Sequence, residues 1–225
     1  MGTDMTTATT ISTSARTEIL RRISVANGGT SDAAAAGAAW EHLAREYRRK
    51  AVLQPESVLD LLEDRLRDYD AHVERVRRGD VADVVAKMLA TRGKRRMVIP
   101  AGIAPEWLPA GFEFVADEGM TAIELDGFDG VMTGSTVAIA ETGTVVLQNV
   151  PGQGRRAVTL VPDYHLCLVS AADVVETVPE AMEGLRGKAE LATTFFSGPS
   201  ATADIEMTRI KGVHGPRHLD VILIL

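Results

Sequence analysis

Three glycine-rich segments place polar side chains beside predicted strands, where an α/β sheet holds its ligands. They are AETGT at 140–144, GQGRR at 152–156 and SGPSATADIE at 197–206. In the third, the strand TTFF ends at Ser197, Gly198 permits a sharp turn, and Ser200 and Thr202 precede a short predicted helix. Backbone N–H groups at a helix start carry partial positive charge and can bind a carboxylate or phosphate. The segment therefore predicts an anion-binding turn, or else a helix start that Ser200 and Thr202 only cap.

Charged and ionisable side chains in the same stretches are candidates for binding and catalysis. Arg155 and Arg156 follow two loop glycines and could clamp a carboxylate or phosphate bidentately, although paired loop arginines are often simply solvated. Glu141 lies in a predicted strand-turn-strand and could be a nucleophile or general base if partly desolvated. Alternatively, it accepts hydrogen bonds from the N–H groups of its own turn. His214 lies between two glycines in GVHGP, which allow a ligand to approach closely.

A second histidine lies close to the one cysteine of the chain. His165 and Cys167 are two residues apart on a predicted strand and share a face. A Cys–His nucleophile is one interpretation, but neighbours on one strand rarely reach each other in line, and a small buried cysteine usually belongs to the core. The sequence has no cysteine pair, no HExxH, no Walker A string and no GxGxxG. It therefore predicts no metal site and supports no nucleotide fingerprint.

The elements that must position these residues follow from the pattern beyond Arg96. Short β-rich runs are bounded by glycine, proline and aspartate, and several are continuously apolar, as in a strand covered on both faces. In AIAETGTVVL only a tight turn fits between two strands, which predicts antiparallel pairing. Helical runs lie between strands at 178–189, with Pro179 in the first turn, and near 202–207. Together they predict a three-layer α/β fold with a mostly parallel sheet. The expected strands are MVIP at 97–100, FEFV at 112–115, TAIEL at 121–125, TVAIA at 136–140, TVVLQ at 144–148, AVTLV at 157–161, HLCLV at 165–169 and LDVILIL at 219–225.

Helices are expected in the N-terminal third. Ser31 and Asp32 can cap a helix with one buried stripe, whose members are Trp40, Leu43 and Tyr47. Apolar residues with alternating spacings of four and three predict a second helix from Val58 through Val76, with Gly79 at its end. A third helix is predicted over 81–89, after Asp80.

The length of 225 residues fits one domain, or one domain with a helical appendage. We expect a Thr-rich disordered tail at 1–15, a helical segment at 16–95 and an α/β domain at 96–225, the last two forming one compact unit. Residues 1–96 carry 17 basic and 14 acidic side chains, whereas residues 97–225 carry 7 and 17. The acidic second part argues against a nucleic-acid surface, which needs Lys and Arg to neutralise phosphates.

Composition also bears on location and partners. No apolar stretch is long enough to span a bilayer, and the first residues lack the apolar core of a signal peptide, so we expect a cytoplasmic protein. A single cysteine can form no internal disulfide and cannot supply the four thiolates that an iron–sulfur cluster usually needs. Any redox cluster must therefore lie on another chain. The apolar string LDVILIL could be the interface of a homo-oligomer.

Five strings in order, AIAETGT, GRR, VPDYH, SGPSATADIE and GVHGP, resemble the LUD domain family, also called DUF162. The resemblance covers 96–225 firmly and the N-terminal third more weakly. It implies an α/β fold similar to the NagB/RpiA/CoA-transferase superfamily, preceded by a helical lead-in. It also implies a subunit of an assembly that oxidises L-lactate to pyruvate, with iron–sulfur partner proteins and no cofactor on this chain. An anionic small molecule, such as a 2-hydroxy or 2-oxo acid, is the implied ligand.

The same resemblance implies which residues form the site. CoA transferases use a glutamate before a glycine turn as nucleophile, and Glu141 in AETG looks similar in its Glu and its Gly. The alternative function is therefore a free-standing CoA-transferase-like or sugar-phosphate-binding enzyme that uses Glu141. The expected catalytic residues are Glu141 and His214. The expected ligand-binding residues are Thr142, Gly143, Arg155, Ser197, Gly198, Ser200, Thr202, Asp204 and Gly215.

Overall fold

The computed structural model describes residues 6–29, 32–188, 190–202, 210–212 and 214–225, and divides the chain into two units, 1–47 and 48–225. The first unit contains helices α1 (Thr6–Ala26) and α2 (Ala33–Glu41). Helix α1 therefore occupies part of the stretch that was expected to be a disordered tail. The Asp32 carboxylate caps α2 by accepting a hydrogen bond from the Ala34 N–H, as predicted.

The buried stripe predicted for α2 is wrong. The helix ends at Glu41, before Leu43 and Tyr47, so these two cannot continue a helical face. No residue of α2 is buried, and Trp40, Leu43 and Tyr47 are all exposed. The alanine-rich sequence supplies helix propensity but few large side chains to pack.

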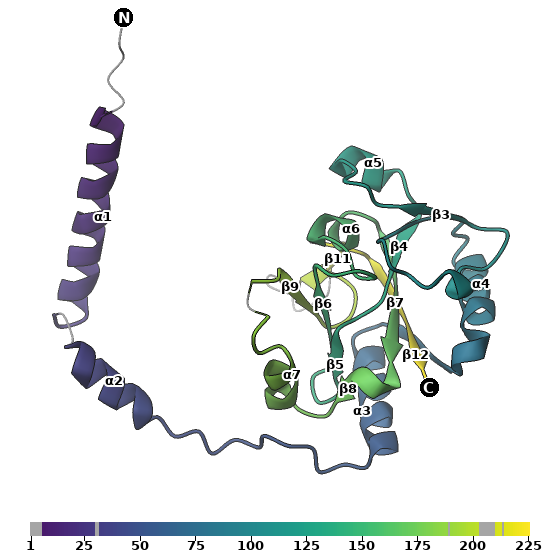
Figure 1. Cartoon of the computed structure of the whole chain (residues 1–225), viewed down its shortest axis with the longest axis horizontal. Coiled ribbons are helices and arrows are strands. Elements are labelled where there is room, and N and C mark those ends of the chain that lie inside the picture. Colours follow the sequence, from purple (N-terminus) through teal and green to yellow (C-terminus); the bar gives the residue numbers. More distant parts are fainter. Residues whose placement is uncertain (1–5, 30–31, 189, 203–209, 213) are drawn as a thin grey trace, which may run out of the picture. The chain divides into compact units, whose positions relative to one another are not determined.

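The second unit is built on a six-stranded sheet, which is parallel throughout (Figure 1). Its strand order is β1-β12-β7-β4-β2-β3. The strands are β1 (His72–Val76), β12 (His218–Ile224), β7 (Tyr164–Ser170), β4 (Gly130–Thr133), β2 (Arg96–Ile99) and β3 (Glu113–Ala116). The prediction of a mostly parallel α/β sheet is confirmed.

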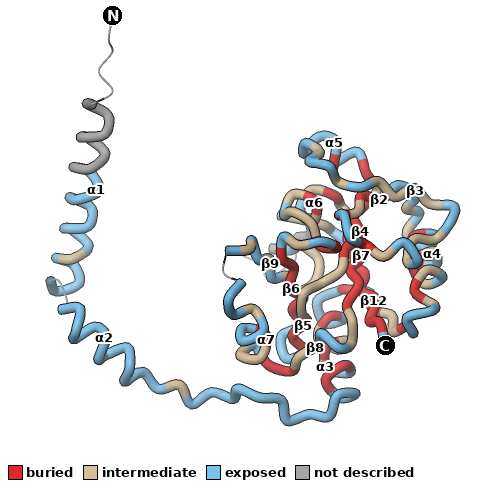
Figure 2. Tube along the Cα trace, in the orientation of Figure 1, coloured by how far each residue is buried: buried red, intermediate tan, exposed pale blue. Residues whose placement is uncertain are grey.

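Alternate residues of the central strands pack on opposite faces. On one face, His165, Cys167 and Val169 of β7 lie toward α3 (Pro55–Asp68) and a second sheet; on the other, Leu166 and Leu168 lie toward α4 (Val81–Thr91). Strands β7 and β12 are buried almost along their whole length (Figure 2). This explains why both read as continuous apolar runs.

The second sheet has the order β8-β5-β6-β9 and supplies one wall of the candidate site. Its strands are β5 (Val137–Ile139), β6 (Thr144–Gln148), β8 (Val174–Val175) and β9 (Thr193–Phe196). Strands β5 and β6 form the predicted antiparallel hairpin, with Glu141 and Gly143 in its turn. Helix α7 (Val178–Gly184) covers the far face, and Thr177 and Glu180 form a capping box at its start.

Three predicted elements are wrong. The helix expected through Val76 ends at Asp68; Asp70 takes a φ of 66°, and the chain turns into strand β1. The runs TAIEL and AVTLV are not strands but short helices, α5 (Ala122–Asp126) and α6 (Arg156–Leu160). For α5 the physical reason is a capping box between Thr121 and Glu124, which satisfies the first N–H groups.

The string LDVILIL also differs from one expectation. As β12 it is hydrogen-bonded to β1 on one side and β7 on the other, and its apolar side chains are buried except for that of Leu225. It therefore cannot be the surface of a homo-oligomer. The remaining short elements are η1 (Arg78–Asp80), η2 (Pro105–Trp107), η3 (Ala171–Asp173), β10 (Ala201–Thr202) and β11 (Ile210–Lys211).

Two further sequence expectations concern the helix predicted near 202–207 and membrane-spanning segments. Thr202 belongs to β10, and the rest of the helix expected near 202–207 lies outside the described residues. Across the residues that the structure describes, no helix is both long and apolar enough to cross a membrane.

Candidate functional site

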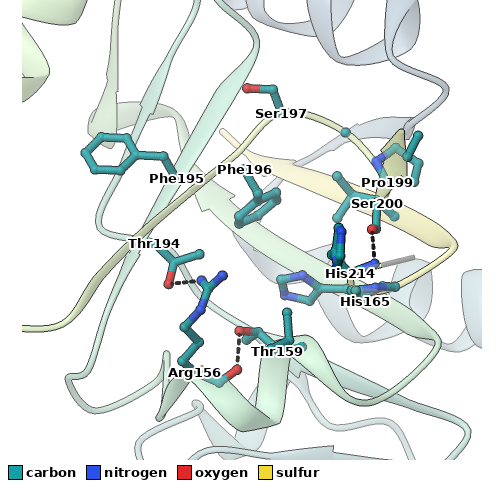
Figure 3. Close-up of a pocket in the computed structure, with 16 residues that line it drawn as sticks. Arg156, Thr159, His165, Thr194, Phe195, Phe196, Ser197, Pro199, Ser200 and His214 are labelled. Carbon is teal, nitrogen blue, oxygen red and sulfur yellow. Dashed lines mark hydrogen bonds between the residues drawn. The ribbon is translucent and has the colours of Figure 1, made fainter. Parts of the chain in front are cut away.

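A cavity of about 270 Å³ lies between the second sheet, helix α6 and the amino ends of β7 and β12. The segments 194–201 and 214–216 close it on the remaining sides (Figure 3). Its lining combines apolar groups, such as Phe196 and Leu219, with the side chains of Arg156, Thr159 and His165. A mostly apolar hollow with a few convergent polar groups is the usual form of a small-molecule site.

The cavity brings together the following predicted site residues: Ser197, Gly198, Ser200, His214 and Gly215. Hydrogen bonds around Ser200 hold their loops together. The Ser200 N–H donates to the Pro216 carbonyl, the Gly212 N–H donates to the Ser200 carbonyl, and the His214 N–H donates to the Ser200 hydroxyl. The Thr202 side chain and Asp204 lie outside the described residues.

Gly198 is required where the loop passes helix α3. Its φ is +82°, and a Cβ built there would lie 2.5 Å from Tyr69 Cβ and 2.7 Å from the Tyr69 carbonyl oxygen. Only glycine combines this backbone conformation with such a close approach. The end of α3 therefore determines where the 197–200 rim of the cavity lies.

The predicted residues on the β5–β6 turn lie next to the cavity rather than in its lining. A chain of hydroxyl contacts joins them to it: Thr142 to Thr144 at 2.7 Å, and Thr144 to Ser197 at 2.7 Å. Gly143, at φ +60°, packs against the backbone of Arg65, where a Cβ would come within 3.0 Å of the carbonyl carbon.

Glu141 makes an ion pair. Its Oε1 accepts a hydrogen bond from Arg48 Nη2 at 2.8 Å, and the same guanidinium contacts the buried Glu176. The Val52 and Leu53 N–H groups also donate to Glu176, and these bonds tie the segment before α3 to the second sheet. The Leu53 N–H contributes most to lowering the pKa of Glu176, and Arg48 adds to it. This arrangement gives Glu141 a structural contact, and its predicted catalytic role stays a prediction.

The neighbouring arginines have different surroundings. Arg155 forms a bidentate pair with Asp117, at 2.7 and 2.8 Å, and also donates to the Met120 carbonyl. The Asp117 side chain is only 7% exposed, and the Arg155 guanidinium is the main cause of its lowered pKa. Arg155 is absent from the described lining of the cavity and is already occupied by a protein carboxylate.

Arg156 instead lines the cavity. Its Nη1 donates to Thr194 Oγ1 at 2.8 Å, and no carboxylate of the described chain lies within ion-pair distance. A second, open cleft of about 760 Å³ shares Arg156 and His214 with the cavity and contains Arg217, which Asp163 already neutralises. Arg156 is therefore positioned to bind an anion at the junction of the two hollows.

His165 forms part of the inner wall. It is 3% exposed, and its ring lies 5.3 Å from that of Phe196 (Figure 3). Its Nε2 is 2.8 Å from the Thr133 hydroxyl. Burial lowers the pKa of His165 to about 4, so the ring is neutral at physiological pH. Burial also raises the pKa of Cys167 to about 12, which makes it an inert thiol and agrees with the core interpretation.

His165, Thr159 and the aromatic side chains of Phe195 and Phe196 were not predicted from the sequence as residues of the site. Strand alternation indicated that His165 shares a face with Cys167, but nothing local shows that Phe196 and helix α6 leave a hollow over that face. Arg156 was noted only together with Arg155. Among the described residues, no three His, Cys, Asp or Glu side chains cluster so as to hold a metal ion.

Among the described residues, the hollow beside the parallel sheet thus combines an arginine without a carboxylate partner, hydroxyl groups and a neutral imidazole. Comparison with known proteins supplies the family. The model of the LUD domain matches residues 61–224, and the chain belongs to the LUD domain family.

Individual relatives are similar over different lengths. A protein named "Lactate utilization protein C" from Deinococcus radiodurans is 41% identical over 181 residues, which are 79% of this chain and 84% of that protein. Another of that name from Shouchella clausii is 38% identical over 90 residues, 38% of this chain and 39% of that one. A crystal structure of a DUF162 family protein from Deinococcus radiodurans matches with a TM-score of 0.68 and 36% identity, covering 77% of this chain and 99% of that one.

Proposed function

We propose that this protein takes part in lactate utilisation and binds a small organic acid anion in the cavity beside Arg156. The relative from Deinococcus radiodurans, similar over most of both chains, supports the general role through its name. The observation that carries the ligand class is Arg156, an arginine in the wall of a cavity that no described carboxylate neutralises. A carboxylate or phosphate would supply the missing negative charge.

The proposal extends to the division of labour in the oxidation of L-lactate to pyruvate. This reaction releases two electrons and two protons for each molecule of lactate, so it needs an electron acceptor. Cys167 is the one thiol of the chain, and it is buried. One buried thiol cannot hold an iron–sulfur cluster. We therefore assign the clusters to partner proteins, and to this chain the binding of the acid.

Growth on L-lactate tests the general role. Deletion of the gene is expected to abolish growth on L-lactate as sole carbon source while growth on glucose continues, and the wild-type gene is expected to restore it. The Arg156→Ala gene is expected not to restore growth. The matched control is Arg95→Ala, because Arg95 is exposed and lines neither hollow. Normal growth of the deletion strain on L-lactate would refute the lactate role.

Co-purification tests the partner assignment. An affinity-tagged copy of the full chain, isolated under argon from cells grown on L-lactate, is expected to retain a protein whose absorption shows iron–sulfur clusters. Cells grown on glucose are the control. Recovery of the tagged chain without an iron–sulfur protein from cells that are oxidising lactate would contradict the assignment.

A further inference from the structure

The His165 imidazole is the first member of a chain of polar contacts that runs away from the cavity. Its Nε2 lies 2.8 Å from Thr133 Oγ1, and Thr133 Oγ1 lies 3.9 Å from Cys167 Sγ. Cys167 Sγ lies 3.7 Å from the carbonyl oxygen of Gly134. The side chains of His165, Thr133 and Cys167 are all buried, so the protein itself decides which partner donates each proton.

The last contact in this series, between Cys167 and Gly134, determines which atom donates in each of the hydrogen bonds. A backbone carbonyl can only accept, so the Cys167 thiol donates to Gly134. The sulfur then accepts from the Thr133 hydroxyl. Because that hydroxyl has only one proton, its oxygen accepts from Nε2–H of His165. A neutral imidazole carries one proton, which is then on Nε2, so Nδ1 keeps an unshared electron pair.

Nδ1 has no hydrogen-bond partner among the described residues, although the ring lines the cavity. Among the described residues, the buried polar side-chain atom that has neither a hydrogen-bond partner nor contact with solvent is Nε1 of Trp107, and not Nδ1 of His165. Within the described part of the chain, Nδ1 is therefore an unpaired acceptor on a ring that lines the hollow. The cavity presents a positive charge at Arg156 and an uncharged acceptor at His165.

We infer that Nδ1 of His165 accepts a hydrogen bond from the ligand and makes the cavity prefer 2-hydroxy acids to the corresponding 2-oxo acids. This inference rests on the proposed function in taking an organic acid as ligand. With the carboxylate at Arg156, the hydroxyl of a 2-hydroxy acid can donate to Nδ1. A 2-oxo oxygen can only accept, so it would place one lone pair against another. His165 is thus a specificity residue that distinguishes a 2-hydroxy acid from the corresponding 2-oxo acid.

The tautomer is tested without any ligand. Two-bond ¹⁵N–¹H correlation NMR on the full chain labelled with ¹⁵N-histidine at pH 7 distinguishes the two neutral forms of the ring. We expect the His165 signals of the Nε2–H form, and the same form in Thr133→Ser, which keeps the hydroxyl. In Thr133→Val the ring loses its acceptor, and we expect the Nδ1–H form to increase. An Nδ1–H tautomer in the wild-type protein would overturn the inference.

Ligand preference is tested by calorimetry with two matched pairs of acids. The first pair is L-lactate and pyruvate; the second is L-3-phenyllactate and phenylpyruvate, because about 270 Å³ holds roughly nine waters and exceeds the size of a three-carbon acid. For at least one pair the hydroxy acid is expected to bind about tenfold tighter, the effect of one buried hydrogen bond gained and one acceptor clash avoided. Thr133→Ser should keep this ratio.

Two variants should remove the preference. His165→Gln can still reach Thr133 but lacks the atom at Nδ1, and Thr133→Val frees the ring to change tautomer; in both, the two acids of a pair are expected to bind within about twofold of each other. Thermal unfolding checks that each variant is folded. If Thr133→Val unfolds, His165→Gln and the wild-type tautomer still decide the matter.

The outcomes separate this inference from the proposed function. Equal or tighter binding of the oxo acids by the wild-type protein, or binding of none of the four acids, would overturn the inference even where the deletion strain fails to grow on L-lactate. Conversely, growth of the deletion strain on L-lactate would refute the lactate role, whereas a tenfold preference for phenyllactate with the Nε2–H tautomer would still support the role of His165.

Discussion

Arg155 and Arg156 are adjacent in sequence, yet their replacement should affect different properties of the protein. Arg155→Gln breaks a bidentate pair with Asp117, whose side chain is 7% exposed. Removing one partner of a fully buried pair costs about 3–5 kcal/mol. The Arg155 side chain is 35% exposed, and Asp117 still accepts from the Gly119 and Met120 N–H groups, so we expect a loss of about 2 kcal/mol in the free energy of unfolding.

Arg156→Gln removes one exposed hydrogen bond to Thr194, so we expect a change within about 0.5 kcal/mol in stability. Binding of an organic acid should instead weaken by about 10- to 150-fold, the value of a charge-assisted contact of about 1.5–3 kcal/mol. Circular dichroism would follow thermal unfolding, and calorimetry with the better-binding hydroxy acid would follow affinity.

For a domain of this size, 2 kcal/mol lowers the Tm by about 4–8 °C. The loss in Arg155→Gln should be largest above the ordinary pKa of an aspartate. It should disappear as the pH falls through the lowered pKa of Asp117, because protonation then breaks the pair in the wild-type protein as well. An unchanged Tm in Arg155→Gln at pH 7, or a weakened affinity in that variant with normal affinity in Arg156→Gln, would refute the reasoning.

Three further outcomes follow from the structure. Because burial lowers the pKa of His165 to about 4, this histidine takes up a proton in the unfolded state at a higher pH than in the folded state. Between about pH 6.5 and 4, the free energy of unfolding of the wild-type protein should therefore fall by about 3 kcal/mol relative to that of His165→Gln, as measured by urea titration. The same pH dependence in both proteins would contradict this. Gly198→Ala should lower the free energy of unfolding by more than about 2 kcal/mol and weaken ligand binding. Gly187→Ala, at a glycine with a similar φ but with open space around it, should lower the free energy of unfolding by only about 1 kcal/mol. Equal losses in the two variants would exclude an effect of the steric contact with Tyr69. Glu176→Gln should accelerate amide hydrogen exchange at Val52, and unchanged protection there would show that the carboxylate does not hold this segment.

Much of the fold could be predicted because apolar runs bounded by turn residues mark strands that are covered on both faces. The hairpin of β5 and β6 followed from the short AETG connection, and β7 and β12 from uninterrupted apolar residues. The segment HVERV was mistaken for helix because its valines also fit a helical spacing of three. What decides the matter is its pairing with β12, about 150 residues later in the chain, which no local pattern contains.

The candidate site divides in the same way. The glycine-rich loops around Ser200 and His214 could be recognised because glycine and hydroxyl residues have local conformational preferences, and the structure brings the two together. Arg155 and Arg156 could not be told apart, since the difference between them is a carboxylate 38 residues upstream. The participation of Glu141 in catalysis and the likeness to CoA transferases stay predictions.

The position of β12 between β1 and β7 has a consequence for the order of folding. Within the described chain, β1 pairs with β12 and with no other strand, so β1 has no sheet edge to dock on until residues 218–224 are in place. Until then β7, which carries His165, presents an open apolar edge of the kind that recruits other chains. Because this pairing is among the most distant in the sequence, closing the sheet should be a late and slow step. The candidate cavity, which has Leu219 in its wall, can form only after that step.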